Sequence, residues 1–309
     1  MIPTLQILLA TFNSSQYLSE QLESILAQDF QDFEILINDG GSADSTPELI
    51  RSYQRKFPGK IVFLGNAKAS AIENYTTLMS RSEAELVMFS DHDDVWKPDK
   101  ISRTLSKYRE TESLSGPQTP IMVFTDLEVT DRSLNQISPS LMRYSHFNPR
   151  CFSLNRLLAQ NIASGNTMLL NRALLKAALP IPSEAVMHDH WITLVAAALG
   201  KIVFLDETTL YYRQHDDNIC GAFHYSPYPF FKKLLLGREK LRKRFDRNIL
   251  QAAVFGQRYA ASLNQNDREM LATLADWPSL GFFARRKLLI QYGIFKSGFL
   301  RNIGMFFLA

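Results

Sequence analysis

The stretch LVMFSDHDD, residues 86–94, joins an apolar run directly to three carboxylates within four positions. The run at 86–89 is typical of a buried strand. Neighbouring carboxylates raise one another's pKa and disfavour ionisation unless a cation compensates them. Asp91 and Asp93 therefore predict an oxygen-rich site for a hard divalent ion, Mg²⁺ or Mn²⁺, although a solvated acidic turn would show the same short pattern.

The segments on either side predict the sheet to which this strand belongs. Short apolar runs alternate with segments of helical period, which is typical of strands covered by crossover helices. Strands are expected at 5–9, 33–37, 61–64, 85–89, 121–129, 164–170, 202–205 and 209–213, and helices at 18–26, 46–53, 72–79, 98–108 and 191–199. The fold class is therefore α/β, a Rossmann-like sheet flanked by helices, with helices and connectors after a boundary near residue 222.

Composition bounds the class of protein. With 309 residues, 46% of them apolar, the chain can build a substantial core, and a net charge of only +3 excludes a protein that is basic throughout. Cys151 and Cys220 lack C-x-x-C spacing and fit a reducing cytoplasm. We expect neither a secretion signal nor a spanning helix, because the first residues lack a basic segment and no uncharged apolar run reaches about 18 residues.

Three loops are expected at one edge of the sheet, because ligands bind outside the carboxyl ends of the strands in such folds. They are 11–13 (Thr11, Phe12 and Asn13), 38–42 and 91–94. Asp39 and Asp91, from the second and third loops, could together bind the edge of a nucleobase and the hydroxyls of a ribose. An Asp before Gly-Gly is also a common turn former, because its side chain bonds to its own backbone.

The stretch MHDHW, residues 187–191, is another candidate centre. Asp189 could act as a general base, with Trp191 as an apolar wall. His188 and His190 could instead bind zinc together with His215, and Asp189 could cap the following helix, a role compatible with that of a base.

The stretch LYYRQH, residues 210–215, ends a predicted strand with Arg213 and His215 in alternation. Both side chains are therefore expected on the same face. They could reach a diphosphate or its metal ion, or they could be two ordinary surface side chains.

Six ordered motifs over residues 3–222 resemble those of family 2 glycosyltransferases of the GT-A fold. They are ATFN after the first strand, NDGGSADST with Asp39, SDHDD, SGNTML around Gly165, HD at 188–189 and YRQH ending at His215. Within that family, SDHDDVW and residues 188–215 most resemble bacterial rhamnosyltransferases of cell-surface polysaccharide synthesis. The resemblance implies a GT-A catalytic domain over 1–222, with a mixed sheet flanked by helices, and a helical, basic region over 223–309.

The resemblance also implies a role for each candidate residue. The donor nucleotide would be bound by Thr11, Phe12, Asn13, Asp39, Asp91 and His92. The Mg²⁺ or Mn²⁺ ion would be held by Asp91, Asp93 and His215, with Arg213 and His215 at the diphosphate. Gly165, Asn166 and Trp191 would face the acceptor, and Asp189 would be the base. Three positions depart from the family pattern: Gly40 replaces a second acidic residue, Asn66-Ala67-Lys68 replaces Asn-x-Gly, and His188 replaces the Glu that commonly precedes the base.

The implied activity is metal-dependent, inverting transfer of a sugar to a saccharide or lipid-linked acceptor in O-antigen, LPS or capsule synthesis. The expected donor is dTDP-L-rhamnose, and a UDP-sugar is the first alternative. A sugar-phosphate nucleotidyltransferase would normally show a glycine-rich loop with a basic residue near the N-terminus, which LLATFNSS lacks. A non-catalytic sugar-nucleotide module would have no need of clustered carboxylates.

The last third of the chain is basic and rich in aromatic residues. Residues 231–247 contain eight Lys and Arg residues against two acidic ones, and no acidic residue follows Asp276. Such a composition fits an anionic membrane surface, and the other motifs give no reason to expect nucleic acid. We expect a protein of the bacterial cytoplasm that is peripheral at the inner face of the cytoplasmic membrane, although a solvated basic helix is the simpler interpretation.

Overall fold

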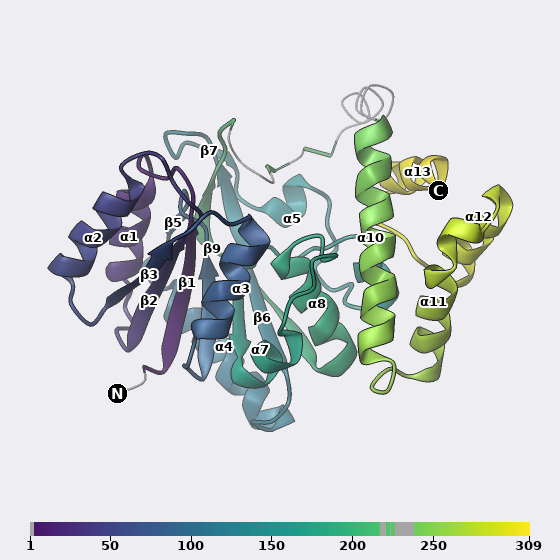
Figure 1. The fold of residues 1–309 in the computed structure, drawn as a ribbon, viewed down its shortest axis with the longest axis horizontal. Coiled ribbons are helices and arrows are strands. Elements are labelled where there is room, and N and C mark those ends of the chain that lie inside the picture. The colour runs from purple at the N-terminus through teal and green to yellow at the C-terminus, as the bar shows by residue number, and fades with distance from the viewer. Residues whose placement is uncertain (1–2, 217–220, 223, 226–237) are drawn as a thin grey trace.

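The computed structural model describes residues 3–216, 221–222, 224–225 and 238–309, and within them a nine-stranded sheet forms the centre (Figure 1). Its strand order is β3-β2-β1-β4-β8-β6-β9-β5, with β7 paired to β6. The strands are β1 (Leu5–Thr11), β2 (Phe33–Asp39), β3 (Ile61–Asn66), β4 (Leu86–Ser90), β5 (Val95–Trp96), β6 (Ile121–Thr130), β7 (Gln136–Ser138), β8 (Met168–Asn171) and β9 (Lys201–Arg213).

The pairing of these strands confirms the expected sheet edge. The pairs β3–β2, β2–β1 and β1–β4 are parallel. Strand β8 is antiparallel to both β4 and β6, so the sheet is mixed. Because β1 lies between β2 and β4, the loops that follow these three strands emerge side by side.

Two predicted strand boundaries are wrong. The strand expected at 164–170 begins only at Met168, because the preceding residues form a 3₁₀ turn, η1 (Gly165–Thr167). The strands expected at 202–205 and 209–213 are one strand, β9, which stays paired with β6 through register shifts near Asp126. The polar residues in its middle suggested a break that sheet pairing overrides.

Three helices cover one face of the sheet. They are α1 (Leu18–Leu26), α2 (Thr46–Lys56) and α4 (Lys100–Ser115), and their apolar stripes pack against the odd-numbered side chains of β1. Helix α2 begins at Thr46 as predicted, with Pro47 in the first turn, where a missing backbone N–H costs little.

The other side of the sheet carries the remaining helices, which are α3 (Ala71–Arg81), α5 (Leu141–Tyr144), α6 (Leu154–Ala159), α7 (Arg172–Ala178), α8 (His188–Leu199), α10 (Arg238–Tyr259), α11 (Gln265–Ala275), η2 (Trp277–Ser279), α12 (Phe282–Gln291) and α13 (Phe299–Leu308). Helices α3, α7 and α8 contact the strands, and α10 stands between this layer and α11, α12 and α13 (Figure 1). Phe255 of α10 and Met305 of α13 belong to the same apolar cluster as Phe89 of β4. The C-terminal helices therefore share a core with the sheet.

The C-terminal region is helical where the structure describes it. The predicted boundary between residues 222 and 223 falls at the edge of a described range. Lys232 and Lys233, two of the predicted basic residues, lie outside the described residues. No helix in the described ranges is both long enough and apolar enough to cross a membrane.

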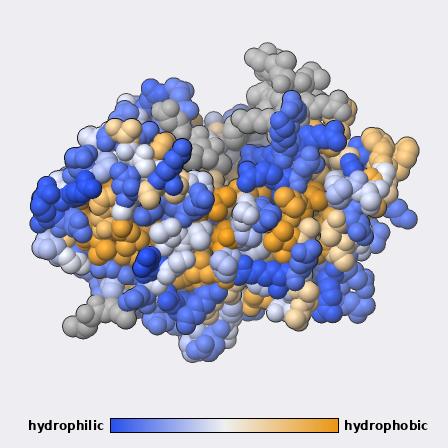
Figure 2. All heavy atoms as spheres, in the orientation of Figure 1, coloured by the Kyte–Doolittle hydropathy of each residue, from blue (hydrophilic) through white to orange (hydrophobic). Residues whose placement is uncertain are grey.

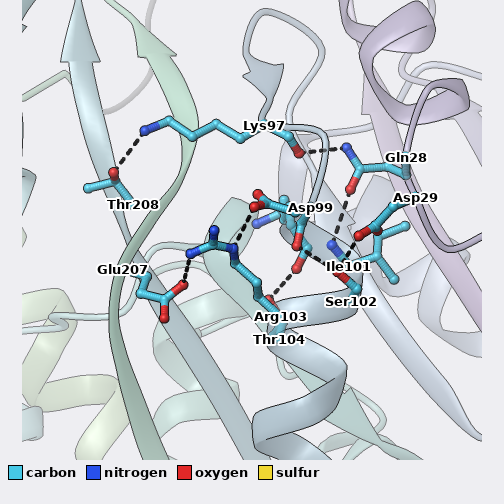
Figure 3. A network of polar contacts seen from close by, with 11 residues as sticks. Gln28, Asp29, Lys97, Asp99, Ile101, Ser102, Arg103, Thr104, Glu207 and Thr208 are labelled. Atoms are coloured by element: carbon cyan, nitrogen blue, oxygen red, sulfur yellow. Dashed lines mark hydrogen bonds and ion pairs between the residues drawn. The ribbon is translucent and has the colours of Figure 1, made fainter.

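Polar contacts fix the chain just after the acidic loop (Figure 3). Gln28, beyond the end of α1, donates to the Lys97 carbonyl at 2.7 Å and accepts from the Ile101 N–H at 3.1 Å. Arg103 bridges Asp99 and Glu207 of β9. Because β4 precedes the loop and these contacts follow it, both ends of residues 91–94 are anchored.

Candidate active site

Asp39 joins the ends of β1 and β2. Its Oδ1 accepts from the hydroxyls of Thr11 at 2.7 Å and Ser42 at 2.6 Å, and its Oδ2 accepts from the N–H groups of Gly41 and Ser42. Asp39 is fully buried, and these four contacts use the acceptor capacity of its carboxylate. In this structure Asp39 therefore acts as a turn former, the alternative that the sequence also offered. Nucleotide binding by Asp39 stays a prediction, and it requires the loss of a Ser42 contact.

Phe12 and Asn13 extend this edge beyond β1. The Phe12 side chain lies just beyond the end of β1 and is 57% exposed. Asn13 has a positive φ of 47°, and its Oδ1 accepts from the Ala43 N–H at 3.0 Å. The loops after β1 and β2 are therefore linked, and they present an aromatic face to solvent.

Asp91 begins the acidic loop and is held by a tyrosine from α3. The Tyr75 hydroxyl donates to Asp91 Oδ1 at 2.8 Å. Burial, together with the negative charge of Asp93, raises the pKa of Asp91 to about 6, and the hydrogen bond from Tyr75 opposes that shift. The sequence marked Tyr75 only as part of a helix, so its contact with the loop was not predicted.

Asp93 and His215 meet as predicted. His215 Nε2 lies 2.8 Å from Asp93 Oδ2, and both side chains are largely buried. Arg213, by contrast, does not point outward toward a diphosphate. It is 3% exposed, and it donates to the carbonyls of Asp93 and Arg132 and to the carboxylate of Glu20. The diphosphate role and the surface alternative for Arg213 are both wrong in this structure, where it supports the acidic loop.

Asp94 connects the acidic loop to the predicted acceptor loop. Asn166 Nδ2 donates to Asp94 Oδ2 at 2.5 Å, and the Lys100 ammonium donates to the Asn166 carbonyl at 3.0 Å and to Thr209 Oγ1 at 3.2 Å. Burial, with the charges of Asp93 and Asp91, raises the pKa of Asp94 well above its ordinary value, and burial lowers that of Lys100 to about 7. Asn166 thus holds the acidic loop against the start of α4 through Asp94 and Lys100. The sequence did not predict the contact of Lys100 with Asn166, because a single Lys at the start of a helix does not indicate its partner.

Asp189 lies beside the predicted acceptor loop. Its Oδ2 accepts from the Gly165 N–H at 3.3 Å, and its Oδ1 accepts from the His190 N–H at 2.6 Å. Burial raises the pKa of Asp189 to about 7; the His190 N–H bond opposes this shift, and the charge of Asp91 adds to it. Helix α8 is capped at Met187, so Asp189 lies in the first turn and is not the N-cap.

The two histidines beside Asp189 are packing residues, and the zinc alternative is wrong. His188 stacks on Tyr75 with ring centroids 3.8 Å apart, and burial lowers its pKa to about 3. His190 is bonded to the Leu157 carbonyl at 2.7 Å and contacts the Gln251 amide. Across the residues described by the structure, these histidines join no group of three side chains that could hold zinc.

Trp191 does not form the predicted acceptor wall. It is fully buried, it donates to the Ala178 carbonyl at 3.0 Å, and its ring packs edge-on against Phe255 of α10. The C-terminal helices occupy the space that the sequence interpretation left open for a ligand.

Gly165→Ala should lower the rate of any reaction that uses Asp189 by about tenfold, because small displacements of a catalytic group are costly. A Cβ at this position would lie 2.8 Å from His188 Nε2 and 3.5 Å from Asp189 Cβ, so α8 or the loop must move. Steady-state kinetics would measure the loss, with Gly281→Ala as a control for glycine replacement, since its φ of −71° suits alanine and its Cβ would meet open space. An unchanged rate would contradict close packing at Gly165.

The residues at this edge fit a divalent ion that takes further ligands from a substrate. Asp91 and Asp93 are oxygen donors whose close charges raise the pKa of Asp91, as expected where a cation is needed. Among the residues that the structure describes, however, no three metal-ligating side chains are gathered into one group. Asp91, Asp93 and His215 therefore do not form a closed cage, and a bound diphosphate would have to complete the coordination.

Comparisons with known proteins identify the family of the chain. The family model described as "Glycosyl transferase family 2" matches residues 6–175. An uncharacterized glycosyltransferase of Nostoc sp. is 28% identical over 225 residues, which are 69% of this chain and 66% of the Nostoc protein. The chain thus spans just under two thirds of the length of that relative.

A relative with a described activity and a solved structure with the same fold extend this comparison. The dTDP-rhamnosyl transferase RfbG of Shigella flexneri is 25% identical over 240 residues, covering 75% of this chain and 80% of that protein. The crystal structure of S. aureus TarS 1-349 in complex with UDP-GlcNAc superposes with a TM-score of 0.55 at 19% identity, covering 93% of this chain and 89% of that one.

Proposed function

The chain belongs to glycosyl transferase family 2, with a GT-A fold, and we propose that it moves L-rhamnose from dTDP-L-rhamnose to an acceptor hydroxyl with inversion. The observation that carries the proposal is Asp189, a buried carboxylate beside the Gly165 loop whose pKa is raised by burial to about 7. The choice of rhamnose is supported by the similarity to the Shigella flexneri protein, which extends over 80% of that protein.

In the proposed mechanism, Asp189 takes the proton of the acceptor hydroxyl as that oxygen attacks the anomeric carbon of the donor. The bond between the anomeric carbon and the diphosphate oxygen breaks in the same displacement, so the configuration inverts. A β-linked dTDP-L-rhamnose would give an α-L-rhamnoside. The N–H groups of Gly165 and His190 orient the carboxylate of Asp189 toward this reaction.

The acidic loop would hold the donor's diphosphate side. Asp91 and Asp93, with His215, would bind Mg²⁺ or Mn²⁺, which when present neutralises charge that develops on the leaving diphosphate. Tyr75 and Arg213 keep the two carboxylates in place through their contacts with Asp91 and the Asp93 backbone.

The loops after β1 and β2 would bind the nucleoside. The exposed Phe12 ring offers a stacking face for a base, and Thr11, Asn13 and Asp39 supply polar groups around it. His92 lies beside Asp91, where it would contact the ribose side. None of these groups selects thymine over uracil by itself, so a UDP-sugar is the alternative donor.

The acceptor is proposed to be a saccharide or lipid-linked saccharide of O-antigen, LPS or capsule synthesis, met at the inner face of the bacterial cytoplasmic membrane. Exposed cations on α10 and exposed aromatic side chains on α12 and α13 support this location.

A thermal-shift panel of nucleotide sugars, each with and without Mn²⁺, tests the proposed function. The expected result is a selective, Mn²⁺-dependent rise in melting temperature with dTDP-L-rhamnose. A selective response to a UDP-sugar would keep the transferase and change its donor. If every nucleotide sugar left the melting temperature unchanged, the transferase proposal would fail.

The pH profile should show the base directly. Because burial raises the pKa of Asp189 to about 7 and only its deprotonated form accepts a proton, kcat/KM should fall as pH decreases through 7, approaching tenfold per unit. Rates measured between about pH 5 and 9 would show this limb. A profile that stays flat down to about pH 5 would contradict the assignment.

A further inference from the structure

A group of basic side chains lies on α6, on α10 and around the start of α13, three elements of which α10 contacts the other two. It consists of Arg156 on α6, Arg244 on α10, Lys296 before α13 and Arg301 on α13. Arg156 donates to the Lys296 carbonyl at 3.3 Å, and Arg301 donates to the adjacent Ser297 carbonyl at 3.1 Å. These four residues are called the basic cluster below.

The basic cluster has excess positive charge. Burial, together with the nearby charges of Arg244 and Arg301, lowers the pKa of Lys296 to about 8. Within the described part of the chain, no carboxylate forms an ion pair with any of the four side chains. Arg156 Nε is buried and has no hydrogen-bond partner there. Converging cations without acidic partners are typical of a site for an anion.

The basic cluster is linked to the candidate base. Gln251 of α10 accepts from the Val186 N–H at 2.8 Å and contacts the His190 ring, so α10 is held against the start of α8. Arg244 lies seven residues earlier, on the same face of α10. Its positive charge acts on both Asp189 and Lys296. An anion at the cluster would therefore be near the acceptor side of Asp189.

An apolar groove continues from the basic cluster. It has a volume of about 720 Å³ and lies between α12 and α13, lined by Phe282, Phe295, Phe299, Ile303, Phe306 and Phe307. The Phe299 ring is 76% exposed and that of Phe283 82% exposed, and Figure 2 shows apolar side chains at the surface over α12. Asn302 lines the groove and also binds the backbone of Lys296 at 2.7 Å, so groove and cluster are contiguous.

We propose that this composite site binds the carrier of the acceptor, a lipid whose apolar chain lies in the α12–α13 groove and whose phosphate or diphosphate is held by Arg244 and Lys296. Charge complementarity selects an anionic headgroup, and the aromatic lining suits a long hydrocarbon chain. The inference rests on the proposed transferase function and specifies its acceptor class as a lipid-linked phosphate ester. The saccharide attached to that phosphate would then extend toward Asp189.

Calorimetric titration with farnesyl diphosphate, a soluble isoprenoid diphosphate, tests the site on the full chain. Wild-type protein should bind it at least about tenfold more tightly than inorganic diphosphate, because the latter lacks the chain. Arg244→Gln with Lys296→Gln, and separately Phe299→Ser, should each weaken binding by at least about tenfold. Lys243→Gln, whose side chain pairs with Glu239 on the same helix, and Leu114→Ser, an exposed residue of α4, should bind as wild type does.

Several results would overturn this inference. The cationic double variant could bind farnesyl diphosphate as tightly as wild type does, or inorganic diphosphate could bind as tightly as farnesyl diphosphate. Competition between dTDP and farnesyl diphosphate would also overturn it, because it would place the ligand in the donor site. Flotation with phosphatidylglycerol vesicles separates the two lipid sources. Flotation that the double variant and Phe299→Ser abolish, without farnesyl diphosphate binding by wild type, would make the surface a bilayer contact instead.

The thermal shift with a nucleotide sugar and Mn²⁺ keeps the test of the lipid site separate from the test of the transferase proposal. Variants that keep the wild-type thermal shift with a nucleotide sugar and Mn²⁺ are folded and bind donor, so their loss of farnesyl diphosphate binding reports on the composite site. Absent lipid binding with an intact donor response would refute the inference alone. An absent donor response in wild type would refute the transferase proposal, whatever the lipid result.

Discussion

Asp189→Asn is expected to lower kcat for sugar transfer by about 10³-fold, within the range for loss of a positioned general base. Asparagine keeps the size of the side chain and can still accept from the Gly165 or His190 N–H, so the loop should keep its conformation. It cannot take a proton from the acceptor hydroxyl. Initial rates of nucleotide release at saturating donor and acceptor would measure the loss.

The affinity for the donor is the control that separates a loss of catalysis from a loss of donor binding. The dissociation constant of the nucleotide sugar, measured by calorimetry, should stay within about twofold of wild type, since Asp189 lies on the acceptor side. Glu184→Gln, a carboxyl-to-amide change five residues earlier, should affect neither rate nor affinity. Normal turnover by Asp189→Asn would remove this residue from the mechanism.

Lys100→Met is expected to lower the free energy of unfolding by about 3 kcal/mol, because breaking one partner of a buried polar network leaves the others unsatisfied. Lys100 is fully buried, and its ammonium is the donor to the Asn166 carbonyl and Thr209. Methionine fills a similar volume, so the loss would come from the polar contacts. Urea denaturation followed by circular dichroism would measure it.

A second substitution distinguishes this network from simple packing. Asp94→Asn removes the buried carboxylate that faces the same Asn166, and its charge acts on Lys100. The double variant should therefore lose less stability than the sum of the single variants. Strictly additive losses would show that Lys100 and Asp94 do not interact.

Much of the fold was predictable because local pattern and topology agree. The strands that end at Thr11, Asp39 and Ser90 are short apolar runs whose carboxyl ends must meet in a parallel arrangement. The expected meeting of Asp93 with His215 is confirmed by their contact, and the contact of Gly165 with Asp189 is an addition from the structure.

The errors arise where tertiary packing decides a role. Arg213 resembles an anion-binding side chain in sequence, yet the carboxylate of Glu20 and the carbonyls of Asp93 and Arg132 accept from its guanidinium. Trp191 resembles a ligand wall until α10 places Phe255 against it. Periodicity shows which residues share a face, but it does not show which later helix will cover that face. Lys100 was missed for the same reason, since its partners are 66 and 109 positions away.

The most direct measurement of the central claim is an EPR titration of Mn²⁺ with wild type and Asp93→Asn, each with and without dTDP. The proposed site predicts that wild type binds Mn²⁺ much more tightly when dTDP is present, because Asp91, Asp93 and His215 leave coordination positions for a diphosphate. Asp93→Asn should weaken this ternary complex by at least about tenfold. Equal Mn²⁺ binding by Asp93→Asn and wild type in the presence of dTDP would contradict a metal and diphosphate site at this edge of the sheet.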